Sequence, residues 1–139
     1  LGYAGAVQIT GAFIAIHAEI VDQKLNVTGG VLDWISVPKV GSVDDAGNPI
    51  GGLFYLVTLM QAGPDDQQKP CRMKLELARH DQTVETLAEG EITFDGDTGE
   101  NRFWVMPFVM QAERQGRMVL INSIEGGGFV SIPVDVRFS

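Results

Sequence analysis

The stretch CRMKLELAR, residues 71–79, decides the fold class of this chain. Apolar and charged side chains alternate along it: Cys71, Met73, Leu75 and Leu77 take one set of positions, and Arg72, Lys74 and Glu76 take the other. Successive side chains of a β-strand point to opposite faces of a sheet, so this alternation predicts a strand with one buried and one solvated face.

The same period of two recurs along the chain and leaves little room for helices. Apolar residues alternate with polar ones over 84–94 and again over 130–139. The segments LFYLVTLM (53–60) and RFWVMPFVM (102–110) are apolar at both sets of positions, which predicts central strands covered on both faces. Pro107 cannot donate to a strand ladder, so we expect a bulge or an edge position there. No window shows a helical apolar stripe with caps.

Turn-forming residues separate the alternating segments, at 21–24, 64–68, 80–83, 95–101, 113–116 and 125–128. This spacing predicts about nine strands. They are 6–10, 12–20, 24–28, 31–37, 53–61, 71–79, 84–94, 102–111 and 117–124, and 129–138 is a further strand if the first is only an extension. The one long connection, residues 38–52, contains proline and glycine, and we expect a loop that is functional or mobile.

This series of strands predicts an all-β fold with a single domain. Strands without helices between them pack as two sheets face to face. We therefore expect an antiparallel β-sandwich of the jelly-roll or immunoglobulin-like kind, with a small barrel as the alternative. The sandwich domain is expected to span residues 12–139, and residues 1–11 are expected to form an N-terminal extension or a first strand.

The net charge of −8 and the single cysteine restrict the classes of partner and location. An acidic surface repels phosphate backbones and anionic lipids, so neither nucleic acid nor a membrane is expected as a partner. Cys71 is the only cysteine, so no internal disulfide is expected. The chain shows no signal-peptide pattern and no apolar run long enough to span a membrane. We therefore expect a cytoplasmic protein.

The glycine pair in NVTGGVLDW, residues 26–34, raises the question of a phosphate-binding loop. Such a loop needs a helix N-terminus after the glycines, to supply backbone N–H groups and a dipole. The residues that follow Gly30 have the apolar, β-branched character of a strand, and no lysine stands in a Walker-type position. We therefore expect a turn or a bulge at Gly29 and Gly30.

The candidate metal and catalytic groups lack the partners that their chemistry needs. The acidic loop 95–101 does not have the residue order of an EF-hand, so we expect a hairpin turn, with a weak calcium site as the alternative. His17 and His80 are the only histidines, and Cys71 alone could complete a zinc site with them. The chain has no G-x-S-x-G nucleophile elbow. The sequence therefore predicts no catalytic residue, no metal and no cofactor.

The larger aromatic residues stand among valine, leucine and methionine rather than among cations. This setting predicts core positions for Trp34, Phe54, Tyr55, Phe103, Trp104 and Phe108. The segments 53–60 and 102–110 nevertheless carry more apolar surface than one face of a sandwich can use. We expect the excess to form the interface of a symmetric homodimer, with contact residues Trp104, Met106, Phe108 and Met110. The alternative is that all four belong to the core of one subunit.

The order of features over residues 16–37 and downstream is distinctive. The segments are IHAEIVDQKLNVTGGVLDWISV (16–37), with Lys24-Leu25, Gly29-Gly30 and Trp34, then RMKLELARHDQTV (72–84) and FVSIPVDVRF (129–138). Together they resemble a family of small uncharacterised bacterial proteins of unknown function, common in actinobacteria. Members of that family usually have a glycine directly before the lysine, where this chain has Gln23. The resemblance implies an all-β sandwich and no known activity, so it assigns no site residue.

These observations favour a non-catalytic role. We expect a protein-binding or assembly module that works as a homo-oligomer, with a dimer favoured, or with another protein. A structural subunit of a larger particle, such as a phage or capsid-like jelly roll, is the first alternative. A hydrolase or metal-binding protein that uses His80, Asp81 or the 38–52 loop is the second.

Overall fold

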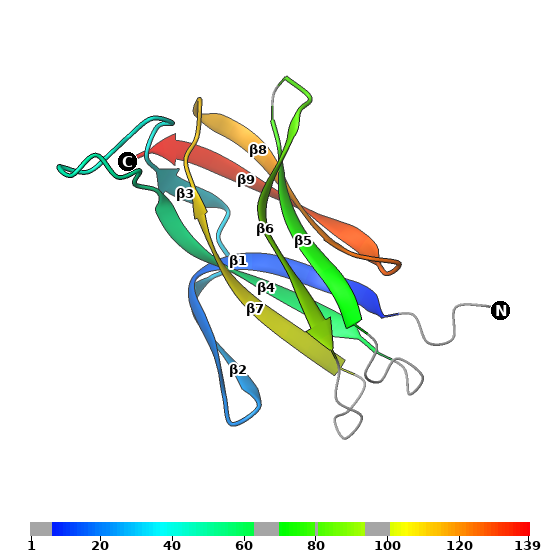
Figure 1. Cartoon of the computed structure of the whole chain (residues 1–139). Coiled ribbons are helices and arrows are strands. Elements are labelled where there is room, and N and C mark those ends of the chain that lie inside the picture. Colours follow the sequence, from blue (N-terminus) through cyan, green and yellow to red (C-terminus); the bar gives the residue numbers. More distant parts are fainter. Residues whose placement is uncertain (1–6, 63–69, 80, 94–100) are drawn as a thin grey trace.

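The structure is a computed structural model, and it describes residues 7–62, 70–79, 81–93 and 101–139. Nine β-strands and no helix are found in these ranges (Figure 1). They are β1 (Gln8–Val21), β2 (Lys24–Gly30), β3 (Trp34–Val37), β4 (Gly52–Gln61), β5 (Pro70–Ala78), β6 (Val84–Thr93), β7 (Asn101–Met110), β8 (Gly116–Ile124) and β9 (Gly128–Phe138). The prediction of an all-β chain with about nine strands is confirmed.

The strands form two sheets. One has four strands in the order β2-β1-β4-β7, and the other has five in the order β3-β9-β8-β5-β6. Neighbouring strands are antiparallel, except that β3 and β9 are parallel, with Trp34 opposite Asp135 and Val37 opposite Phe138. The prediction of purely antiparallel sheets was wrong for this pair. The reason is that β3 enters its sheet after crossing over from the other sheet, not through a hairpin with its neighbour.

The two sheets bury an apolar core between them. In β5, Met73, Leu75 and Leu77 are fully buried while Arg72 and Lys74 are exposed, as the alternation in residues 71–79 predicted. The same rule holds in β9, where every second residue from 132 to 136 belongs to the core. The side-chain period of two therefore accounts for the core of the five-stranded sheet.

Some boundaries and positions differ from the predictions. β1 is one continuous strand across the expected boundary between residues 11 and 12, with only a register shift between Ile9 and Gly11. β4 is central as expected, but β7 is the last strand of its sheet, so only one of the two doubly apolar segments is a central strand. Pro107 lies on this last strand, and the expectation of an edge position for it is confirmed.

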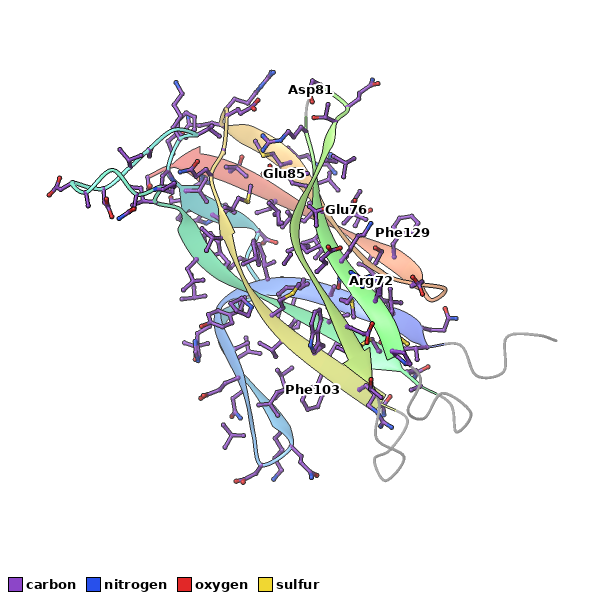
Figure 2. The ribbon with its side chains drawn as sticks, viewed as in Figure 1. Arg72, Glu76, Asp81, Glu85, Phe103 and Phe129 are labelled. Atoms are coloured by element: carbon purple, nitrogen blue, oxygen red, sulfur yellow. The ribbon has the colours of Figure 1, made fainter. Side chains whose placement is uncertain are left out.

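The four-stranded sheet is apolar on its outer face as well as on its inner face. The outer side chains form rows across β1, β4 and β7: Ala15–Tyr55–Pro107, Phe13–Val57–Val105 and Gly11–Leu59–Phe103. Phe103 is labelled near the start of β7 in Figure 2. We call these residues the outer apolar layer. Ala15 and Val57 in this layer are 0% exposed although neither belongs to the core between the sheets, so the outer side chains bury one another.

The β1–β2 hairpin extends away from the rest of the fold (Figure 1). Its turn residues, Asp22 and Gln23, have φ angles of 51° and 63°. Two central residues with positive φ are characteristic of a two-residue type I′ turn, so the tight turn expected at 21–24 is confirmed. All residues of β2 except Leu25 are exposed.

The long connection between β3 and β4 is held by hydrogen bonds. The amide Nε2 of Gln111 donates to the carbonyl of Ser42 at 3.2 Å and to the carbonyl of Ile50 at 2.5 Å. The carboxylate of Asp44 accepts the backbone N–H groups of Ala46 and Asn48, both at 2.9 Å. The Gln111 bonds hold the connection against the end of β7, and the Asp44 bonds hold a turn within the connection.

Candidate functional site

The residues expected as dimer contacts lie inside the subunit. Met106, Phe108 and Met110 are at most 8% exposed and belong to the core between the sheets. Trp104 is partly buried and packs against the same core. These four side chains contact their own subunit, and we do not propose a dimer built on them.

The candidate metal and catalytic residues are not brought together. His17 is exposed on β1, with its Nε2 atom 4.0 Å from a carboxylate oxygen of Glu19 and its ring against Tyr55. No group of three or more His, Cys, Asp or Glu side chains that could hold a metal ion occurs among the residues the structure describes. His80 and residues 95–100 lie outside the described ranges.

Asp81 lies at the tip of the β5–β6 hairpin and has a local structural role (Figure 2). Its Oδ1 atom accepts the hydroxyl of Thr83 at 2.6 Å and the backbone N–H of Thr83 at 3.0 Å. The Thr83 hydroxyl, followed by the Thr83 N–H, lowers the pKa of this carboxyl below its ordinary value. A carboxylate satisfied in this way by its own turn is explained without catalysis.

The chain crosses from the four-stranded to the five-stranded sheet between Gly30, the last residue of β2, and Trp34, the first residue of β3. Gly29 has a φ of +66°, and a Cβ atom on it would lie 2.6 Å from Cγ1 of Ile16, so only glycine fits. Before it crosses, the chain makes a last bond to β1, in which the N–H of Leu32 donates to the carbonyl of Ile14 at 3.1 Å, and Leu32 packs against the core. The glycine pair thus forms the last two residues of β2, with Gly30 opposite Ala15 and the positive φ confined to Gly29, and the chain leaves the first sheet after it.

The crossing leaves β3 with one open side. β3 is the end strand of its sheet, and only β9 pairs with it. The carbonyls of Asp33 and Val37 accept the N–H groups of Asp135 and Ser139, at 2.9 and 3.0 Å. Main-chain groups of a strand alternate in direction, so the N–H and C=O groups of Trp34 and Ser36 point away from β9.

A hollow of about 470 Å³ runs along this open side. Its lining consists of the apolar residues Ile16, Val31, Leu32 and Phe54, together with Asp33 and residues 34–36 of β3. We call it the Trp34 groove. Ile16 and Phe54 come from the four-stranded sheet and the other residues from the crossing and from β3, so the groove lies where the two sheets separate.

Trp34 is held at the rim of this groove by β9. Half of the residue, 50%, is exposed. The guanidinium of Arg137 lies over its ring at 4.2 Å from the centroid, and Nε of Arg137 donates to the carboxylate of Asp135 at 3.0 Å. Asp33, also exposed, has no side-chain hydrogen bond or ion pair with the described residues. The groove therefore combines apolar walls, a fixed aromatic ring and an unpaired carboxylate.

A second hollow, of about 280 Å³, lies beside the connection between β3 and β4 and is lined in part by Arg79. The guanidinium of Arg79 pairs with the carboxylate of Glu85 and with that of Glu113, which lies 3.3 Å away. Two carboxylates already neutralise this cation, so it offers little to an anionic ligand.

No family model matches the chain, and no curated protein sequence matches it. The fold is similar to part of the alkylpurine DNA glycosylase AlkC of Pseudomonas fluorescens, solved bound to DNA that contains an abasic site analogue. The TM-score is 0.52 at 10% identity, over 96% of this chain. The match spans 31% of the length of that glycosylase chain.

An immunoglobulin-like protein from Pseudomonas aeruginosa is also similar, with a TM-score of 0.41 at 13% identity. The match covers 98% of this chain and 100% of that one.

The glycosylase structure corrects the expected set of partners. Nucleic acid was excluded because the chain carries a net charge of −8, yet this fold occurs within a protein solved bound to DNA. The exclusion was wrong because net charge describes the whole surface, whereas phosphate contacts depend on a local group of cations.

In the described residues, no helix is long and apolar enough to cross a membrane.

Trp34 was predicted to lie in the core, but it is half exposed at the rim of a groove that was not predicted. The signal was present in the alternation of the strand itself. Ile35 and Val37 take one set of positions and are buried, whereas Trp34 shares the other set with the polar Ser36. A tryptophan in the same set as a serine is on the solvated face of the strand.

Proposed function

We propose that this chain is a non-catalytic protein-binding module that takes up an extended peptide segment in the Trp34 groove. The proposal includes one β-sandwich domain of the immunoglobulin-like kind, membership of the actinobacterial family that the sequence resembles, and a cytoplasmic location. Two sheets around a common core support the sandwich.

The observation that carries the proposal is the open side of β3 next to an apolar hollow. An extended peptide can add to the free edge of a sheet, with main-chain hydrogen bonds for affinity and pockets for alternate side chains. Trp34 and Ser36 each offer one N–H and one C=O group on that side. A peptide strand placed there would direct every second side chain over Ile16 and Phe54.

The other end strands are less suited to this role. β7 carries Pro107, which has no N–H group. β6 lies close to β7, because a Cβ atom on Gly90 would be 3.2 Å from the ring of Trp104. β2 is exposed along nearly its whole length, but neither hollow described above is lined by it. Among these edges, β3 alone borders the Trp34 groove.

The test uses a neutral alternating peptide, acetyl-Val-Gln-Val-Gln-Val-amide, added to the ¹⁵N-labelled chain. We expect the amide signals of Trp34 and Ser36 to shift and their hydrogen exchange to slow, because their N–H groups become hydrogen-bonded. Shifts confined to surfaces away from β3 would overturn the proposal.

Two substitutions of Ser36 separate strand addition from other modes of binding. Ser36→Pro removes the N–H that points into the groove and leaves the bonds of β3 to β9 in place, so it should abolish binding. Ser36→Ala removes only the hydroxyl and should bind as tightly as the original chain. Equal binding by both variants would show that the main chain of β3 takes no part.

A further inference from the structure

We propose that the Trp34 groove selects peptide segments that carry a basic side chain, and that the carboxylate of Asp33 binds this side chain. This inference rests on the proposed function and names the chemistry of the partner. Asp33 is exposed at the groove, directly before β3, and its carboxylate has no hydrogen-bond or ion-pair partner among the described residues. A lysine or arginine on the bound segment would supply that partner.

The other charged groups at this site are already paired with each other. Asp135 accepts the hydrogen bond of Arg137, and the guanidinium of Arg137 covers the ring of Trp34. The charge that this pair contributes is close to zero, so Asp33 sets the sign of the potential in the groove. The net charge of −8 over the whole chain adds a long-range attraction for a cationic segment and repels an acidic one.

Different parts of the groove recognise different parts of a bound segment. The outward N–H and C=O groups of Trp34 and Ser36 bind any extended main chain, and the walls of Ile16 and Phe54 accept apolar side chains. Neither feature distinguishes a basic from an acidic segment. Selectivity for charge therefore depends on Asp33.

The experiment compares three peptides of equal length and apolar content: acetyl-Val-Lys-Val-Lys-Val-amide and the corresponding glutamine and glutamate peptides. Affinity is measured from the amide shifts of Trp34 and Ser36 at low and at high salt. We expect the lysine peptide to bind about fivefold more tightly than the glutamate peptide at low salt. The difference should shrink at high salt, because exposed charges are screened.

Three variants assign the selectivity. Asp33→Asn should remove most of the difference between the lysine and glutamate peptides, and Asp33→Lys should reverse it. Glu91→Gln removes the same charge from an exposed position of β6, at the far end of the five-stranded sheet, and should leave the difference unchanged. Circular dichroism of each variant verifies that the fold is retained.

The outcomes distinguish the two proposals. If all three peptides bind in the groove with equal affinity, the peptide-binding function stands and the selectivity for basic segments is overturned. If no peptide shifts Trp34 or Ser36, or if only a single-stranded thymidine oligonucleotide does so, both proposals are overturned. A lysine preference that survives Asp33→Asn and Asp33→Lys would overturn the role of Asp33.

Discussion

At the scale of single residues, one buried polar pair connects the two sheets. Thr58 of β4 and Asn122 of β8 are both 0% exposed. The Thr58 hydroxyl donates to Oδ1 of Asn122 at 2.6 Å, and Nδ2 of Asn122 donates to the carbonyl of Lys74 at 3.0 Å. Buried polar groups are tolerated when they are hydrogen-bonded, so removing one of these two side chains leaves a polar atom of the other buried without its partner.

We expect Thr58→Val to lower the free energy of unfolding by about 1–3 kcal/mol, because it leaves the Asn122 oxygen buried without a donor. Urea unfolding measures this change. The double variant Thr58→Val with Asn122→Leu should cost less than the sum of the two single changes, since neither partner is then left unsatisfied. Thr86→Val, at an exposed position of β6, is the control and should change the free energy of unfolding by less than about 0.5 kcal/mol. Strict additivity of the two core changes would contradict the coupling.

A second prediction at this scale concerns the pKa of Asp81. The hydrogen bonds from Thr83 stabilise the ionised form and lower this pKa. The turn therefore gains stability above the ordinary pKa of an aspartate and loses it as the pH falls through the lowered folded value. Thr83→Val should raise the pKa of Asp81 toward its ordinary value, whereas Thr83→Ser should keep it low. An NMR titration of the Asp81 carboxyl carbon tests this, and an unchanged pKa in Thr83→Val would contradict it.

At the scale of elements, the turn of the β1–β2 hairpin is formed by two residues that are not glycine and that disfavour the left-handed backbone conformation this turn requires. Asp22 and Gln23 both have positive φ, which costs an L-residue roughly 1–2 kcal/mol and costs glycine little. Gln23 therefore adopts a left-handed backbone that glycine would adopt at little cost.

We expect Gln23→Gly to raise the free energy of unfolding by about 0.5–1 kcal/mol, because relief of the left-handed backbone exceeds the added entropy of the unfolded chain. Chemical denaturation is the measurement. Gln61→Gly replaces an exposed residue at the end of β4, where φ is not positive, and should destabilise instead. Equal effects of the two changes would show that the turn backbone is not the cause.

At the scale of the whole molecule, the four-stranded sheet has two apolar faces and the five-stranded sheet has one. The inner face contributes to the core, and the outer apolar layer packs on its own side. Val57 belongs to this outer layer and Val136 to the core, and both are 0% exposed. The fold therefore buries apolar area on both sides of β4, a central strand.

We expect Val57→Ala and Val136→Ala to lower the free energy of unfolding by similar amounts, about 2 kcal/mol each, because each removes two buried methyl groups. Val109→Ala removes the same atoms from a valine that is 57% exposed and should cost less than about 0.5 kcal/mol. Thermal or urea unfolding of the three variants gives the comparison. A Val57→Ala effect as small as that of Val109→Ala would show that the outer layer contributes no stability.

The sequence by itself determined the elements of this fold. Alternation along residues 71–79 and 130–138 predicted which side of β5 and β9 faces the core. The side-chain period of two is a property of the strand's own backbone, so it is the same whichever strands are its neighbours in the sheet. The turn at 21–24 was also predicted, since turn residues act on their own backbone. The absence of a helix after the glycine pair was sufficient to reject a phosphate loop.

Only the tertiary structure decided which strands lie next to one another. The parallel pairing of β3 with β9 joins residues about a hundred positions apart in sequence, and no local pattern specifies such a pairing. The edge position of β7 follows from the same sheet order, so its doubly apolar sequence was misread as that of a central strand. The Trp34 groove exists because Ile16 and Phe54 of one sheet meet the open edge of β3 from the other. A site made by two sheets is set by their packing, which depends on contacts between distant segments and not on the period of any one strand.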